Sequence, residues 1–283
     1  MSSKTGFLTI SEALRQGTKL LEEAAVPVPR LTAEVLLAHA LRQERVYLIG
    51  HSTDELTELA WIHYGRYLHQ RIGGKPTQYI TKKQEFYGRD FTVSPDVLIP
   101  RPETEHVVEA ALARIDPSDR VVDIGSGSGA IAVTLALECR AEVWAVDIST
   151  AALSVALSNA RRLGADVQFV GADVLTAFRP ASFDVVVSNP PYVGLHEAEG
   201  MQREVRDFEP HIALFGGETG AEVYEKIIVQ ARDVLRPGGW LLFELGWRSL
   251  DPVRGMLTDG WSDIEAVGDL ASIPRVLAAR WTP

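Results

Sequence analysis

The chain of 283 residues has a single cysteine, Cys139, and its seven histidines show no metal-ligand spacing. One cysteine excludes an internal disulfide and a metal site built from several thiolates. Scarce cysteine is also typical of proteins in a reducing compartment. We therefore expect a cytoplasmic protein without a metal centre.

Long apolar runs and an excess of basic residues are also missing. No run is long enough to cross a membrane, so no membrane association is expected. Lysine and arginine total 28 against 38 acidic residues, which gives a formal net charge of -10. This balance argues against a protein that binds nucleic acid mainly by contacts with the phosphate backbone, and no stable nucleic-acid binding is expected.

What is present divides the chain into three stretches. Residues 1–75 place apolar residues at helical spacing, which predicts a small helical domain that ends at a Gly73–Pro76 hinge. Residues 76–95 alternate and are rich in aromatics, which predicts a β-hairpin linker. Residues 96–283 are long enough to form the larger second domain.

Apolar strands alternate with helices in the third stretch. Near-continuous apolar strands separated by helices indicate a mostly parallel sheet that is covered on both faces. The right-handed crossover rule makes this a doubly wound α/β domain. Strands are expected at 121–124, 142–146, 167–170, 183–188 and 240–245, with a closing antiparallel pair at 264–267 and 276–280.

A glycine-rich turn, Gly125-Ser126-Gly127-Ser128-Gly129, follows the first of these strands. Such a turn lets the backbone approach a ligand and aims helix N–H groups at it. Asp147, at the end of the next strand, is placed to accept hydrogen bonds from ribose hydroxyls. With Ala130 the turn also satisfies a dinucleotide-binding pattern, so these residues alone leave a nicotinamide dehydrogenase open.

The strand at 183–188 ends in Asn189-Pro190-Pro191-Tyr192. Prolines cannot continue a central strand, so Asn189 and the Pro190 carbonyl are expected at the carboxyl edge of the sheet. Their two oxygens can accept both N–H hydrogens of a planar amide or base amine, and Tyr192 can pack against its flat face. Such positioning can activate a weak nitrogen nucleophile without a charged base.

Together these motifs resemble a class I S-adenosylmethionine-dependent methyltransferase, a Rossmann-like fold, that acts on a planar nitrogen. The wider chain is similar to the PrmC/HemK family, the glutamine-N5 methyltransferases of peptide chain release factors. The resemblance covers nearly the whole chain. Besides Asn-Pro-Pro-Tyr it rests on Gly74–Pro76, Gln78–Ile80, Glu85–Gly88, Val97–Glu105 (VLIPRPETE), Asp123–Ile131, Ala145–Ser149, Phe208–Pro210, Ala213–Leu214 and Arg275–Val276.

The resemblance implies S-adenosyl-L-methionine as cofactor, S-adenosyl-L-homocysteine as product, and no metal. Gly125 to Gly129 would line the methionine portion of the cofactor, and Asp147 would hold its ribose. Asp173 and Val174 would flank the adenine. Relatives often carry an aromatic residue where this chain has Val174, so stacking there would be weaker.

The resemblance also implies the substrate, a glutamine in the Gly-Gly-Gln loop of a release factor. Asn189 would lie beside the methyl sulfonium, and Asn189, Pro190, Pro191 and Tyr192 would clamp the glutamine. Asn189, Pro190 and Tyr192 would be the catalytic residues. The helical domain of residues 1–75 would recognise the bulk of the release factor.

Two alternatives to this function stay open. A nucleic-acid methyltransferase acting on adenine N6 or guanine N2 would present a similar amino group to Asn-Pro-Pro-Tyr, and a steep salt dependence of DNA or RNA binding would support it. A non-catalytic scaffold that binds the cofactor is the other, although the intact clamp argues against it.

Overall fold

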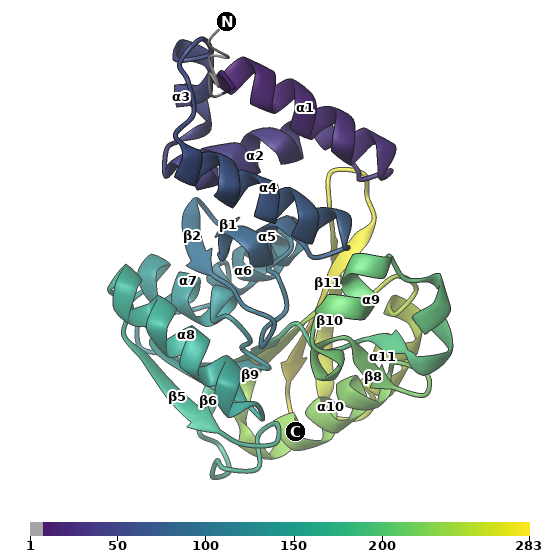
Figure 1. Ribbon diagram of the computed structural model, residues 1–283. Coiled ribbons are helices and arrows are strands. Elements are labelled where there is room, and N and C mark those ends of the chain that lie inside the picture. Colours follow the sequence, from purple (N-terminus) through teal and green to yellow (C-terminus); the bar gives the residue numbers. More distant parts are fainter. Residues whose placement is uncertain (1–7) are drawn as a thin grey trace, which may run out of the picture. The chain divides into compact units, whose positions relative to one another are not determined.

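The computed structural model describes residues 8–283, so residues 1–7 of the expected helical domain lie outside the described part. By internal contacts the chain separates into two compact units. Unit 1 runs through Lys82 and includes the later segment Arg203–Phe208, whereas unit 2 comprises Lys83–Gln202 and Glu209–Pro283 (Figure 1). Within residues 8–283, no helix is long and apolar enough to cross a membrane.

Unit 1 is a bundle of helices around an aliphatic core that includes Tyr64. Thr9 caps the first helix and exchanges hydrogen bonds with Glu12, a reciprocal cap that fixes the helix start. The buried Arg71 pairs with Glu204 of the later segment at 2.6 Å. The helices are α1 (Ile10–Glu23), α2 (Pro29–Leu41), α3 (Arg45–Gly50), α4 (Glu58–Ile72), α5 (Thr77–Thr81) and α9 (Arg203–Phe208).

The expected hairpin is shorter than the stretch 76–95. Thr77–Thr81 forms helix α5 instead of a strand, and only β1 (Lys83–Phe86) and β2 (Arg89–Thr92) pair, in antiparallel register. Phe86 and Phe91 are buried in a core of unit 2. The aromatic anchors therefore assign the hairpin to unit 2, while the apparent alternation before Lys83 belongs to a helix of unit 1.

Unit 2 is built on a seven-stranded sheet with the order β10-β11-β9-β6-β3-β4-β5. The parallel strands are β3 (Arg120–Ile124), β4 (Glu142–Asp147), β5 (Val167–Gly171), β6 (Phe183–Ser188) and β9 (Leu235–Glu244). β10 (Trp261–Gly268) and β11 (Pro274–Trp281) add the closing antiparallel pair. The doubly wound α/β prediction is confirmed.

One strand start differs from the sequence expectation. The strand expected at 240–245 begins earlier, because β9 starts at Leu235 and includes Pro237–Gly239. The pairing of β9 with β6 shifts register between Phe183 and Val185, which accommodates the extra residues.

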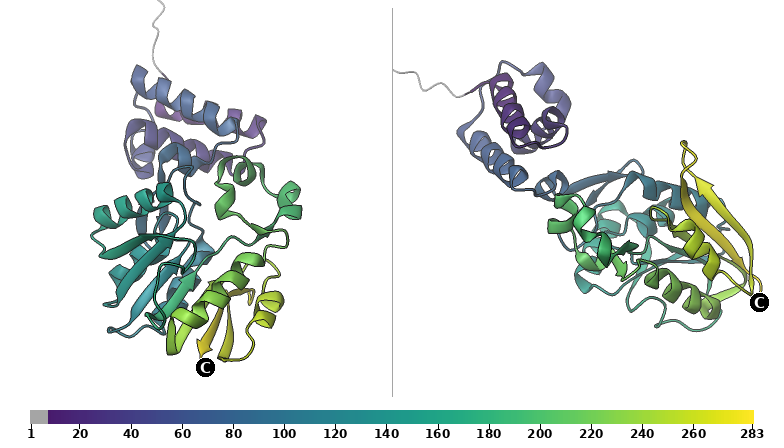
Figure 2. Two further views of the ribbon diagram at one scale, coloured as in Figure 1. Left: turned by 90° about the horizontal axis from the view of Figure 1, so that it is seen from below. Right: turned by 90° about the vertical axis from the view of Figure 1, so that its right-hand side faces the viewer.

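Helices cover both faces of this sheet. α6 (Glu105–Leu112), α7 (Ala130–Glu138) and α8 (Thr150–Leu163) pack on one face, and α10 (Glu222–Val234) and α11 (Leu250–Met256) pack on the other (Figure 2). Val121 points into the first core and Val122 into the second. Burial on both sides explains why the strands are almost continuously apolar. The remaining elements are η1 (Pro102–Thr104), β7 (Val193–Gly194), η2 (Leu195–Gly200), η3 (His211–Ala213) and β8 (Phe215–Gly217).

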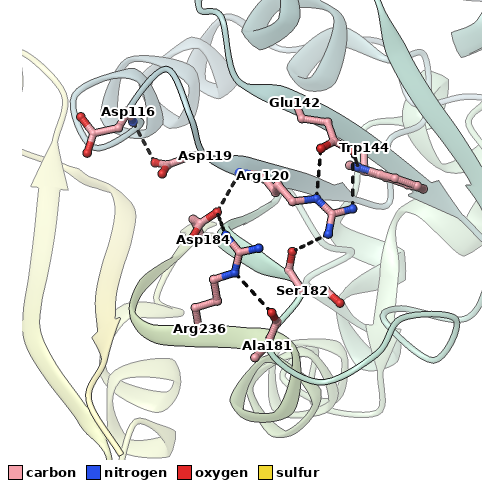
Figure 3. A network of polar contacts seen from close by, with 9 residues as sticks. All are labelled: Asp116, Asp119, Arg120, Glu142, Trp144, Ala181, Ser182, Asp184 and Arg236. Carbon is pink, nitrogen blue, oxygen red and sulfur yellow. Dashed lines mark hydrogen bonds and ion pairs between the residues drawn. The ribbon is translucent and has the colours of Figure 1, made fainter.

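A charged network ties together the starts of the parallel strands (Figure 3). Asp184 of β6 accepts a hydrogen bond from Arg120 N at 2.8 Å and is reached by Arg236 Nη1 at 2.8 and 3.0 Å. Arg120 Nε also donates to Glu142 Oε2 of β4 at 3.1 Å. Strands β3, β4, β6 and β9 are thus joined at the edge opposite to their carboxyl ends.

We predict that Asp184→Ala lowers the free energy of unfolding by about 1–3 kcal/mol, because it strips a backbone N–H and a guanidinium of a charged acceptor. Urea denaturation measures the change. The control is Glu109→Ala on α6, whose side chain is 63% exposed and 3.7 Å from His106; we expect a change within about 0.5 kcal/mol there. Equal losses in the two variants would contradict the assigned role of the network.

Candidate functional site

A cavity of about 250 Å³ opens at the carboxyl ends of β3, β4 and β6. From β3 the chain proceeds outward to β4 and β5, and then returns to the other side of β3 to form β6 and β9. Open α/β sheets bind ligands at such a switch point. Of the residues predicted from the sequence, the cavity is lined by Gly125, Gly127, Asp147, Asp173, Val174, Asn189, Pro190 and Pro191.

The other predicted residues of the glycine turn, Ser126, Ser128 and Gly129, are not part of the cavity lining. Ser126 and Ser128 are buried, and the Ser128 carbonyl accepts a hydrogen bond from Asn159 Nδ2 at 2.9 Å. Gly129 caps α7 with a φ of 82°. These three residues shape the turn and start the helix, but they do not line the cavity.

The wall formed by the glycine turn is open backbone. A Cβ at Gly125, where φ is +71°, would meet no atom within 4 Å, so this position faces free space. Asp147 Oδ2 accepts from Gly127 N at 2.9 Å, and its Oδ1 accepts from Ser149 N at 2.8 Å. Each carboxylate oxygen has a further lone pair. Asp147 therefore fixes the turn and keeps acceptor capacity for a ligand that carries hydroxyl or ammonium groups.

Asp173 has a partner that the sequence did not reveal. Its Oδ2 lies 2.5 Å from Nζ of Lys226, on α10, and both residues line the cavity. Phe215 of β8 lines it as well. The positions of Lys226 and Phe215, far along the chain, carry no local motif, so only the fold brings them to this wall.

Asn189 is fixed from two directions. Just before it, Ser188 Oγ donates to Ile124 O at 2.8 Å, which joins the ends of β6 and β3. Asn189 Nδ2 donates to Oγ1 of the buried Thr104 at 3.2 Å. Because the amide nitrogen is engaged by Thr104, the side-chain oxygen of Asn189 is left to accept hydrogen bonds.

Two glycines, Gly216 and Gly246, lie so close to the Asn-Pro-Pro-Tyr loop that neither position has room for a side chain. A Cβ would stand 2.4 Å from Pro191 O if it were added at Gly216 and 2.5 Å from Tyr192 Cδ2 if it were added at Gly246. Tyr192 packs against the core on the α10 face and is absent from the cavity lining. Burial raises the pKa of Tyr192 to about 12, so its phenol is neutral near pH 7. Its expected contact with a substrate stays a prediction.

The segment Val97–Glu105 is held against the site by a buried carboxylate. Glu209 is 4% exposed, accepts a hydrogen bond from Ile99 N at 3.1 Å and pairs with Arg101 at 2.5 Å. Val97 and Leu98 line the cavity. This contact links two motifs, VLIPRPETE and Phe208-Glu209-Pro210, that the sequence showed only as separate stretches.

In the described residues, no group of three or more His, Cys, Asp or Glu side chains could hold a metal ion. The polar groups that line the cavity include backbone amides, the carboxylates of Asp147 and Asp173, the ammonium of Lys226 and the primary amide of Asn189. Such a set suits a polar organic ligand held beside a second group that presents N–H donors.

Comparison with known proteins gives consistent matches. Residues 12–81 match the family profile of the PrmC N-terminal domain, and residues 104–206 match that of the methyltransferase small domain. The release factor glutamine methyltransferase of Koribacter versatilis is 49% identical over 277 residues, which cover 96% of this chain and 99% of that protein. That of Nitratidesulfovibrio vulgaris is 42% identical over 288 residues, with 98% and 97% covered.

A solved structure, a methyltransferase from Pyrococcus furiosus, matches with a TM-score of 0.53 at 20% identity. The match covers 69% of this chain and 89% of that one. At this identity the likeness concerns the fold alone.

We predict that Gly216→Ala lowers the free energy of unfolding by about 1–3 kcal/mol, because its Cβ would be driven into the Pro191 carbonyl. Gly255→Ala is the matched control, since Gly255 lies in α11 and a Cβ there meets nothing within 4 Å. That variant should gain about 0.5–1 kcal/mol. Thermal and urea denaturation compare the two, and a neutral Gly216→Ala would contradict the tight packing of the loop.

Proposed function

Because this chain belongs to the release factor glutamine methyltransferase family, we propose that it methylates the side-chain amide nitrogen (N5) of the glutamine in the Gly-Gly-Gln loop of a peptide chain release factor. The methyl donor is S-adenosyl-L-methionine. The observation that carries the proposal is one cavity that joins the glycine turn and Asp147 to the Asn-Pro-Pro motif. The family assignment confirms the resemblance found in the sequence.

S-adenosyl-L-methionine supplies an electrophilic methyl group on its sulfonium and leaves as S-adenosyl-L-homocysteine. The open backbone at Gly125 and Gly127 suits its methionine portion, and the free lone pairs of Asp147 suit its ribose hydroxyls. Asp173 and Val174 would flank the adenine. Ser126, Ser128 and Gly129 act on the cofactor only through the shape of the turn.

On the substrate side, the Asn189 side-chain oxygen and the Pro190 carbonyl accept the two N–H hydrogens of the glutamine amide. An amide nitrogen is a weak nucleophile, so its fixed orientation supplies much of the rate enhancement. The nitrogen would form a bond to the methyl carbon as the bond from that carbon to sulfur breaks, and it would lose one proton to solvent water, so that the product amide is neutral. Pro191 and Tyr192 complete the clamp.

The role of unit 1 and the location belong to the same proposal. Unit 1 recognises the bulk of the release factor, which the match of residues 12–81 to the PrmC N-terminal domain supports. The low cysteine content supports a cytoplasmic location.

We predict that Asn189→Ala keeps most of its affinity for S-adenosyl-L-homocysteine but loses kcat by about 10²–10³-fold, because the substrate nitrogen is no longer oriented. Incubation with methyl-labelled cofactor and a release factor measures kcat, and calorimetry measures the affinity. The control substrate is the same release factor with Gln→Ala in its Gly-Gly-Gln loop, which should take no label.

Other outcomes would favour the alternatives. Label that still enters the release factor after the Gln→Ala change would show that another residue is methylated. Label that enters DNA or RNA, with binding that depends steeply on salt, would indicate a nucleic-acid substrate. Cofactor binding with no acceptor at all would indicate a scaffold. Binding of NAD without binding of S-adenosyl-L-homocysteine would indicate a dehydrogenase.

A further inference from the structure

An asparagine side chain can present either of two faces to a ligand. Its carbonyl oxygen accepts hydrogen bonds and its NH₂ group donates them, and the two groups differ little in size. The proposed function requires the oxygen of Asn189 to face the N–H donors of the glutamine amide. Some other group must therefore hold the NH₂ of Asn189 on the opposite side, and that group is Thr104, with Oγ1 3.2 Å from Nδ2.

A threonine hydroxyl is itself ambiguous, since it can donate or accept. Thr104 is a dependable acceptor for Asn189 only if its own proton is directed elsewhere. The Thr104 side chain lies beside the buried Glu244 carboxyl, and it favours the ionised form of that group, as a neighbouring hydroxyl that points its proton at the carboxylate does. An ionised carboxylate only accepts hydrogen bonds, so the Thr104 hydroxyl donates to it and keeps its own oxygen lone pairs for the NH₂ of Asn189.

Both supporting residues are held rigidly. Thr104 is 4% exposed, and its backbone N–H donates to Arg101 O at 3.1 Å. Glu244 is 3% exposed at the end of β9, where its carbonyl accepts a hydrogen bond from Tyr224 Oη at 2.7 Å. Oε2 of Glu244 has no hydrogen-bond partner among the described residues. Burial of a carboxyl with one oxygen that makes no hydrogen bond costs free energy, so a functional role explains Glu244 better than a contribution to stability does.

We propose that Thr104 and Glu244 are positioning residues that act through Asn189. Glu244 orients the hydroxyl of Thr104, Thr104 holds the NH₂ of Asn189, and the side-chain oxygen of Asn189 is thereby directed at the substrate nitrogen. The kinetic part of this inference rests on the proposed function, whereas the orientation of Asn189 can be measured without substrate.

The charge state of Glu244 adds a pH dependence. Burial raises its pKa to about 7; the Thr104 hydrogen bond opposes the shift, the nearby Glu103 adds to it, and Arg275 and Arg101 oppose it. The group is ionised above pH 7 and protonated below. Once protonated, Glu244 can donate to Thr104, whose hydroxyl is then free to donate to the Asn189 oxygen and turn the amide over.

We predict that Thr104→Val lowers kcat by about 10- to 100-fold with little change in affinity for S-adenosyl-L-homocysteine, because the Asn189 NH₂ loses its acceptor. Thr104→Ser keeps the oxygen and should recover most of kcat. The control is Thr134→Val in α7, a fully buried threonine whose Oγ1 has no partner among the described residues. It removes the same hydroxyl and should leave kcat unchanged.

The pH profile of kcat tests Glu244. In the wild type kcat should fall as the pH drops through about 7. Glu244→Gln keeps an oxygen that accepts from Thr104 and cannot be protonated in this range, so that fall should disappear. A fall with an unchanged midpoint in Glu244→Gln would overturn the role of Glu244.

The decisive experiment combines NMR with a double-mutant cycle. The Asn189 side-chain NH₂ signal, assigned by its loss in Asn189→Ala, should exchange slowly with solvent in the wild type and in Thr104→Ser, and quickly in Thr104→Val. In the Asn189→Ala background, Thr104→Val should cost no further kcat, since its effect passes through Asn189. Fast exchange in the wild type, or fully additive losses in kcat, would overturn the inference. A wild type that methylates no release factor but shows the protected NH₂ would instead refute the proposed function alone.

Discussion

The site depends on a strand that is forced to stop. Pro190 and Pro191 lack backbone N–H groups, so β6 cannot continue its ladder beyond Ser188. The chain leaves the sheet beside β3, and the residues that follow β3 and end β4 also line the cavity. Asn189 consequently enters the cavity from a fixed strand end, which makes its position far less variable than that of a loop residue.

The two ends of the parallel strands have different roles. At the amino ends, Asp184 and its two arginine partners satisfy one another with charged hydrogen bonds (Figure 3). At the carboxyl ends, polar groups such as the Gly125 backbone and the Asn189 oxygen are left with capacity to bind. Anchoring at one edge lets the other remain incompletely satisfied without loss of the fold, as sites that bind ligands require.

Local patterns predict most of the fold and the parts of the site that sit at strand ends. β3, β4 and β6 were expected within a residue of their bounds, because buried strands read as apolar runs and glycine or proline marks their ends. The prediction of a strand at Thr77–Thr81 was wrong, because a short alternating run fits one helical turn as well as a strand. The contacts of Thr104 with Asn189 and of Ile99 with Glu209 were beyond prediction, because they join residues far apart in the sequence and no local spacing encodes them.

Glu244 shows how stability and orientation oppose each other in this site. Burial raises its pKa from the model-compound value of 4.5 to about 7, so the folded chain holds a proton that the unfolded chain releases. By linkage, the stability that this proton contributes is full below pH 4.5 and is lost as the pH rises through 7. The ionised form that aligns Thr104 and Asn189 is thus the form that weakens the fold. At the end of β9, a single buried carboxyl thus serves the proposed alignment of the Asn189 amide at the expense of stability above pH 7.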